Sequence, residues 1–148
     1  MPTMSETVTE TRDIPAPPAA VLDVIVDVAS YPQWQKDVRS VDVLEHDGQG
    51  RPSRARFVVD ARLFTATYTL DYAYGDGTVR WQLVASDQLR QLDGGYTVAD
   101  AGGGVSRVTY ELEADPTISV PRIMRRAAAE KIVRSALDNL RQRVESAG

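Results

Sequence analysis

The residues of this chain that could do chemistry are mostly aromatic. The sequence has six tyrosines, two tryptophans and two phenylalanines, against one histidine and no cysteine. A tyrosine ring packs on apolar groups while its hydroxyl gives or accepts a hydrogen bond, so tyrosines on one surface suit binding or polarising a carbonyl. No glycine-rich phosphate loop, GxSxG elbow, HExxH motif or paired-carboxylate arrangement occurs. The sequence therefore shows no catalytic constellation, and we expect no cofactor.

The single histidine is a weak candidate for metal binding or proton transfer. His46 stands beside Glu45 and Asp47 in a predicted turn. A metal site usually needs several converging ligands, and the missing cysteines exclude thiolate sites and disulfides. We therefore interpret His46 as a solvated loop residue and expect no metal.

Three arginines crowd the start of the last predicted helix. Arg122, Arg125 and Arg126 lie in its first turns, where the helix dipole disfavours positive charge. A bound carboxylate or phosphate, an anionic membrane surface, or acidic residues on a facing strand would each offset them. Three solvated side chains are the simpler interpretation. Weak contact with anionic membranes through these arginines is thus one hypothesis.

Length and composition limit the class of protein. At 148 residues, with 43% hydrophobic and 26% charged residues, we expect one domain over 1–148 with a sizeable core and disorder at 1–3. A net charge of −4 argues against nucleic acid as the main partner. No signal-like start and no membrane-length apolar run is present, so we expect a cytoplasmic location. Nothing in the sequence decides the oligomeric state.

The spacing of apolar residues changes along the sequence and predicts the order of helices and strands. An opening strand over 4–14 leads into a short helix that starts at Pro17-Pro18 and ends before Pro32, followed by a second small helical turn over 32–37. Alternating residues separated by turn signals then predict six more strands. Their ranges are 38–46, 52–61, 63–74, 78–85, 88–99 and 105–115.

A long amphipathic helix after Pro121 completes the chain. Its apolar stripe runs from Ile123 and Met124 through Ala128 to Val144 and is rich in alanine. Strands 63–74 and 78–85 carry rings on one face and polar residues on the other. A twisted antiparallel sheet that curls around this thin helix would leave space between them, lined by apolar groups and a few hydroxyls. The predicted class is therefore α+β with an internal pocket.

Three segments carry a resemblance to a known family. They are Val28-Ala29-Ser30-Tyr31-Pro32-Gln33-Trp34, Leu92-Asp93-Gly94-Gly95-Tyr96 and Val108-Thr109-Tyr110-Glu111-Leu112. With the order of elements, they resemble the polyketide cyclase/dehydrase and lipid-transport family of the START-like (SRPBCC) superfamily, most of all an actinobacterial single-domain branch. The resemblance implies a helix-grip fold: a curved seven-stranded antiparallel sheet around a long C-terminal helix, with two small helices after the first strand. It also implies a deep hydrophobic pocket, which members use to bind lipids, sterols, polyketides or quinones, and a minority to catalyse.

Pattern and resemblance together predict a set of ligand-binding residues. They are Trp34, Phe57, Phe64, Tyr68, Tyr72, Trp81, Tyr96, Tyr110, Met124 and Ala128. Any one ring could instead fill core, and a strand register wrong by one residue would turn a whole set outward. Trp34 could gate the pocket mouth or plug the junction between helix and sheet, and the second role is favoured because large rings are usually packed.

Three functions remain open from the sequence. The first is binding or transport of a small hydrophobic ligand such as a lipid, polyketide or quinone. The second is a polyketide aromatase/cyclase or dehydratase that acts through pocket shape and polarisation by tyrosine or arginine. The third is an adaptor whose basic helix end docks on a membrane or a protein partner. Fold resemblance alone does not choose among them.

Overall fold

The computed structural model describes residues 6–61 and 63–147. The disorder expected at 1–3 and the strand expected to start at residue 4 thus lie partly or wholly outside the described residues. Within the described ranges, no helix has both the length and the apolar character needed to cross a bilayer.

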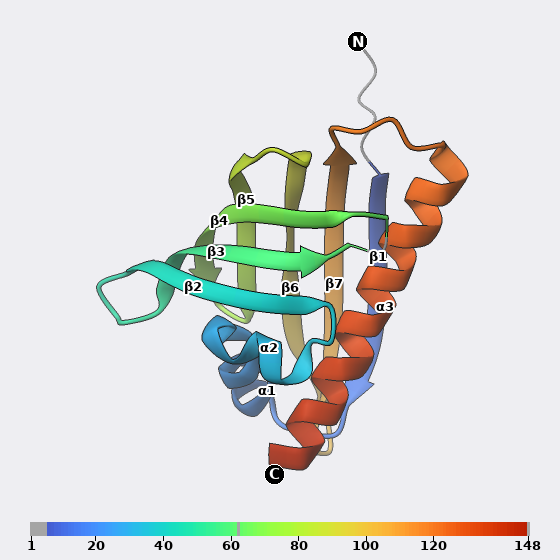
Figure 1. Cartoon of the computed structure of the whole chain (residues 1–148). Helices are drawn as coiled ribbons and strands as arrows, with labels where there is room; N and C mark the ends of the chain where they lie inside the picture. Colours follow the sequence, from blue (N-terminus) through green and yellow to red (C-terminus); the bar gives the residue numbers. More distant parts are fainter. Residues whose placement is uncertain (1–5, 62, 148) are drawn as a thin grey trace.

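The elements follow one another in the predicted order. They are β1 (Glu6–Ile14), α1 (Pro18–Val26), the 3-10 turn η1 (Val28–Ser30), α2 (Tyr31–Trp34), β2 (Val38–His46), β3 (Pro52–Asp60), β4 (Thr65–Gly75), β5 (Thr78–Ser86), β6 (Leu89–Gly102), β7 (Val105–Pro116) and α3 (Arg122–Ala147). The seven strands form one antiparallel sheet in the order β1-β7-β6-β5-β4-β3-β2. Figure 1 shows this sheet curving around α3, with α1 and α2 closing one end. The helix-grip architecture is confirmed.

The first helical segment differs in detail from the prediction. α1 starts at Pro18, as expected for a residue whose missing N–H costs nothing in a first turn. It ends at Val26, earlier than predicted, because Asp27 leaves the helical region with a ψ of 69°. The Ser30 hydroxyl donates to the Asp27 carboxylate at 2.6 Å and holds the η1 turn that follows. Pro32 then lies in the first turn of α2, so it begins the second helix after the first has already ended.

The two faces of the sheet divide as the alternation predicts, with one exception. Ala66 and Leu70 of β4 are buried, whereas Thr65 and Thr67 are exposed. Simple alternation along strand 78–85 predicts Ala85 on the inner face together with Trp81 and Leu83, but it is exposed. The cause is an irregularity between β4 and β5, where Thr69 pairs with Ala85 and Leu70 pairs with Leu83, which shifts the alternation by one residue.

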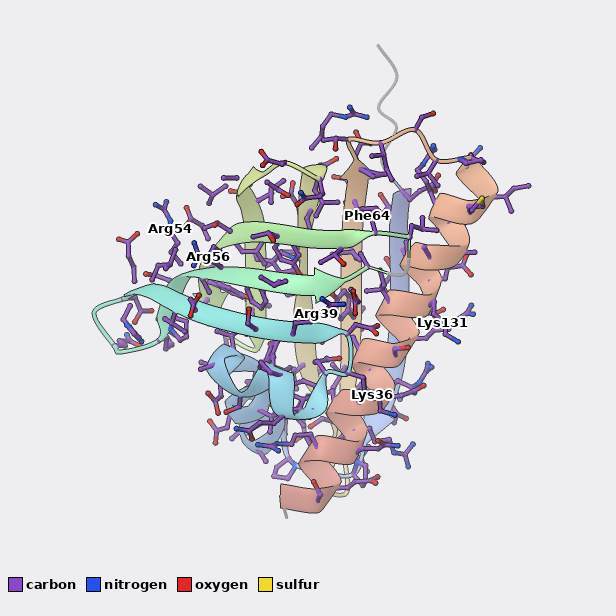
Figure 2. All side chains as sticks on the ribbon, viewed as in Figure 1. Lys36, Arg39, Arg54, Arg56, Phe64 and Lys131 are labelled. Carbon is purple, nitrogen blue, oxygen red and sulfur yellow. The ribbon has the colours of Figure 1, made fainter. Side chains whose placement is uncertain are left out.

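The outer face is charged and held by cross-strand ion pairs. Arg39 pairs with Asp60 at 3.0 Å, Arg54 with Asp71 at 2.6 Å, and Arg56 with Asp42 at 3.2 Å. Figure 2 shows Arg39 on β2 and Arg54 and Arg56 on β3. Such exposed pairs contribute little stability each, about 0–1 kcal/mol. They keep this face of the sheet in water and leave the inner face to the core.

Gly94 and Gly95 in β6 mark a close approach of neighbouring strands. A Cβ on Gly94 would overlap the carbonyl oxygen of Glu111 and lie 3.2 Å from Cζ2 of Trp81. A Cβ on Gly95 would lie 2.6 Å from the carbonyl oxygen of Val79. A side chain at either position would collide with the backbone of a neighbouring strand, so only glycine fits there.

α3 covers the inner face unevenly. Its C-terminal half, with Val133 just before it, brings Leu137 and Leu140 against Val21 and Ile25 of α1 to make a solid core, and all five are 0% exposed. Its N-terminal half offers mainly Ala128 and Ala129. Small residues on the helix opposite large rings on the sheet leave a gap in this half.

Candidate ligand-binding cavity

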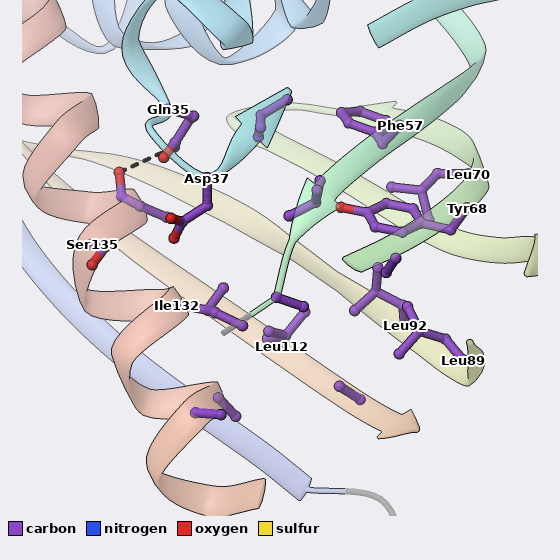
Figure 3. A pocket seen from close by; sticks show the side chains of 18 of the residues that line it. Gln35, Asp37, Phe57, Tyr68, Leu70, Leu89, Leu92, Leu112, Ile132 and Ser135 are labelled. Atoms are coloured by element: carbon purple, nitrogen blue, oxygen red, sulfur yellow. Dashed lines mark hydrogen bonds between the residues drawn. The ribbon is translucent and has the colours of Figure 1, made fainter. Parts of the chain in front are cut away.

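The gap between α3 and the sheet is a cavity of about 170 Å³ that opens to solvent. Strands β3 to β7 supply its floor, α3 its roof, and the residues that precede and begin β2 one side. Figure 3 shows Ile132 of α3 on one side of this space and Tyr68, Leu89 and Leu92 on the other. The predicted space between sheet and helix is therefore present.

Aromatic rings in mutual contact form the floor. Tyr96 and Tyr110 meet edge to face with ring centroids 4.6 Å apart, and Trp81 lies 5.7 Å from Tyr96 and 5.5 Å from Tyr110. Phe57 stacks on Tyr68 at 5.3 Å. Each edge-to-face or stacked pair adds about 0.5–1.5 kcal/mol beyond area burial. The floor is thus made of rings that pack against one another.

The tyrosine hydroxyls fall into two groups. Tyr31 donates to the carbonyl oxygen of Ile25 at 2.6 Å, and Tyr74 donates to that of Pro52, so these two are used by the fold. No hydrogen bond joins the other four hydroxyls to a group of the described residues, and all four tyrosines line the cavity. They belong to Tyr68, Tyr72, Tyr96 and Tyr110. Figure 3 shows the Tyr68 hydroxyl pointing from β4 toward α3.

These phenols are neutral at physiological pH. Burial raises the pKa of Tyr68, Tyr96 and Tyr110 above the ordinary value of 10.0, because a phenolate would lose its hydration. The pKa of Tyr72 rises for the same reason, with a smaller contribution from Tyr31. The wall therefore offers phenol O–H donors and no phenolate base.

One polar group on the roof side was not predicted from the sequence. Gln35, just after α2, is 8% exposed and donates from Nε2 to the carbonyl oxygen of Ala136 at 3.3 Å. Its Oε1 accepts a hydrogen bond from Asn139 at 3.3 Å. Figure 3 shows Gln35 reaching α3, with Asp37 and Ser135 nearby on the wall. The position next to the aromatic Tyr-Pro-x-Trp segment was the only available signal for Gln35.

The second unpredicted polar group lies at the N-terminal end of α3. Arg125 and Glu6 both line the cavity, and Arg125 Nη2 donates to Glu6 Oε1 at 3.3 Å. Arg122 and Arg126 approach the same carboxylate at 3.5 and 3.9 Å. An acidic residue on a facing strand therefore offsets the three arginines, which is one of the alternatives left open by the sequence. The simpler interpretation of three solvated side chains is wrong for Arg125, whose side chain is 9% exposed.

Most of the predicted site residues lie on the cavity wall. Those that line it are Phe57, Phe64, Tyr68, Tyr72, Trp81, Tyr96, Tyr110 and Ala128. Trp34 does not, because it packs edge to face on Tyr31 at 5.0 Å at the junction of helix and sheet. Met124 does not either and is 49% exposed, because α3 turns Arg125 inward in its place. Ile123 and Ala127, which we expected in the same stripe, are also exposed.

A cluster of metal-binding side chains is absent from the part of the chain that the structure describes. No group of three or more His, Asp or Glu side chains there could hold a metal ion. His46 is exposed at the end of β2 and does not line the cavity. The chemistry available at this site is therefore packing on rings, hydrogen bonding by phenols, and the charge of Arg125 and Glu6.

The fold and the cavity define a class of proteins in which a curved sheet surrounds a helix and an apolar pocket lies between them. Comparison with known proteins places the chain in this class. The family described as polyketide cyclase / dehydrase and lipid transport matches residues 5–145. The chain belongs to this family. No curated protein sequence matches the chain.

Solved structures share the fold at low sequence identity. A START superfamily protein from Mycobacterium smegmatis is 20% identical, with a TM-score of 0.90 over 96% of this chain and 99% of that one. An aromatase/cyclase from Streptomyces sp. R1128 is 16% identical, with a TM-score of 0.79 over 95% and 94%. A STAR-related lipid transfer protein from Xanthomonas axonopodis is 18% identical, with a TM-score of 0.77 over 97% and 88%.

Proposed function

We propose that this chain binds a small hydrophobic molecule in the cavity between α3 and the sheet, to carry or sequester it. The observation that supports this most is an apolar cavity that the chain's own side chains leave unfilled. At roughly 24 cal/mol per Å³ of empty apolar cavity, about 170 Å³ corresponds to at most about 4 kcal/mol of lost stability. A ligand that fills the space recovers part of this loss.

The wall also suggests what shape and polarity the ligand has. Rings that already contact one another favour a flat or ring-containing body, which stacks without ordering further side chains. The free hydroxyls of Tyr68, Tyr72, Tyr96 and Tyr110 suit one or two oxygen atoms on that body. A quinone-like, polyketide-like or lipid-like molecule combines these features.

Adjacent alanines on α3 allow a direct test by filling the cavity. Ala128 lines the cavity, whereas Ala127 is exposed on the outer side of the helix. We expect Ala128→Phe to abolish binding of an apolar fluorescent probe and Ala127→Phe to leave it unchanged. Equal binding by the two variants, with no ligand found by mass spectrometry in a solvent extract of the purified protein, would contradict the proposal.

A second candidate is a polyketide aromatase/cyclase or dehydratase. It is favoured by four neutral phenols that face one cavity, because each could donate a hydrogen bond to a carbonyl oxygen of a folded poly-β-ketone. Tyr68→Phe and Tyr72→Phe should then slow turnover of such a substrate while apolar binding persists. An unchanged product distribution with and without the protein would remove this candidate.

A further inference from the structure

The end of the cavity near the start of α3 carries an incompletely paired charge. The Arg125 side chain is 9% exposed and lines the cavity. Its Nη1 donates to the carbonyl oxygen of Val120 at 2.7 Å and its Nη2 to Glu6 at 3.3 Å. Its Nε is buried and has no hydrogen-bond partner. A buried guanidinium N–H without an acceptor costs stability, so its place on a cavity wall needs a reason.

The charges around Arg125 leave an excess of positive charge. Glu6, 6% exposed, is approached by Arg122 at 3.5 Å, Arg125 at 3.3 Å and Arg126 at 3.9 Å. Arg126 also pairs with Glu130, which pairs with Arg134, and Arg134 pairs with Glu10. Among the described residues, the connected network thus holds four guanidinium groups and three carboxylates. One further carboxylate would balance it.

The position of the network adds the helix dipole to this excess. Arg122, Arg125 and Arg126 all lie in the first turns of α3, whose free N–H groups carry partial positive charge. At this end the three arginines face two carboxylates, those of Glu6 and Glu130. The local potential inside the cavity end therefore favours an anion over a cation or a neutral group.

We propose that Arg125 is the polar anchor of the cavity and that the ligand is an apolar molecule that ends in a carboxylate. The inference rests on the proposed function, because it names the chemical class of the molecule held between α3 and the sheet. The ring floor takes the apolar body, and the Arg125 Nε–H donates to the carboxylate oxygen. Glu6 holds the guanidinium in place by its bond to Nη2.

A matched pair of small ligands separates the charge from the apolar body. Naphthaleneacetate and its neutral amide share a two-ring body and differ in the charged group, and calorimetric titration at neutral pH gives both affinities. The wild-type protein should prefer the carboxylate by about tenfold, the range expected of a hydrogen bond to a charged group. Arg125→Met should reduce this preference to about one while binding of the amide persists.

Two further variants guard against a trivial loss of folding. Arg122→Met removes a guanidinium that is 84% exposed and should keep the preference. Glu6→Gln keeps an oxygen that can accept from Arg125 Nη2 but removes the negative charge that competes with the ligand, so it should raise the affinity for naphthaleneacetate and leave that for the amide unchanged. This gain is measurable even if Arg125→Met does not fold.

The outcomes distinguish the two proposals. Equal binding of the carboxylate and the amide by the wild-type protein, or a preference that survives Arg125→Met, would overturn the anchor and leave the apolar cavity as the binding site. A Glu6→Gln variant with weaker carboxylate binding would also overturn it. Binding of neither compound by the wild-type protein would contradict the proposed function and the anchor together.

Discussion

Burial keeps the tyrosines of the cavity neutral, and this gives the protein a characteristic response to alkali. Tyr31, Tyr72 and Tyr96 all have a pKa raised well above 10.0, with burial as the main cause. A raised pKa means that the folded state binds its proton more tightly than the unfolded state. The resulting stability is complete below pH 10 and is lost as the pH rises above it.

We therefore predict a steep alkaline loss of stability. The free energy of unfolding should be insensitive to these tyrosines below about pH 9 and should then fall by about 1.4 kcal/mol per pH unit for each buried tyrosine. Tyr96→Phe should make the fall shallower by one such contribution, whereas Phe57→Leu should leave the slope unchanged. Urea unfolding monitored by circular dichroism across this pH range measures both. A Tyr96→Phe slope equal to that of the wild-type protein would contradict the assignment.

The residues that sequence patterns missed are those that depend on distant partners. The rings of β4 and β5 were predictable because alternation places them on one face. Arg125 was not, because a stripe chosen by apolarity alone includes Met124 and leaves out its charged neighbour. Arg125 turns inward because it meets Glu6, a residue 119 positions away on β1. Gln35 was missed for a similar reason, since its partner Ala136 lies 101 positions away.

At the level of elements, α3 combines a packed half with an open half. The period of 3.6 residues predicted the helix and most of its buried stripe, from Val133 to Val144, but it missed Ala129, which is buried. The bounds of β2 were predicted correctly, but the join between β3 and β4 was not. It spans 61–64, a longer connection than the expected bend, and residue 62 lies outside the described residues. Ala85 was misplaced because alternation in a sequence cannot reveal a bulge.

The two halves of α3 should respond differently to truncation. Leu137 is 0% exposed in the packed half, so Leu137→Ala should lower the free energy of unfolding by about 2–5 kcal/mol. Ile132 lies on the cavity wall and is only partly buried, so Ile132→Ala should cost less. Urea denaturation of the two variants tests this difference. Equal losses would mean that the N-terminal half of α3 is packed as tightly as the rest.

For the whole molecule, membrane contact through Arg122, Arg125 and Arg126 stays a prediction, and fewer of these arginines are available for it than the sequence indicated. Arg125 is engaged by Glu6, which leaves Arg122 and Arg126 at the surface. Beside them, Ile118, Ile123 and Met124 are 49%, 85% and 49% exposed. Apolar side chains next to cations suit the interface of an anionic bilayer.

Liposome flotation tests this contact. The protein should float with vesicles that contain anionic lipid and not with neutral ones, and the double change Ile123→Asp and Met124→Asp should abolish flotation. Leu44→Asp, at an exposed apolar position on β2, is the matched control and should have no effect. Flotation that is independent of lipid charge, or that survives the double change, would contradict membrane contact at this end.

The central claim is that an apolar molecule enters the space between α3 and the sheet, and the positions of the two tryptophans allow a direct measurement. Trp81 lines the cavity, whereas Trp34 packs outside it. In a Trp34→Phe variant, the fluorescence of Trp81 alone should be quenched saturably by an apolar naphthoquinone, and adding Ala128→Phe should abolish the saturation. Linear, unsaturable quenching that is the same with and without Ala128→Phe would show that the quinone does not enter the cavity and would contradict the claim.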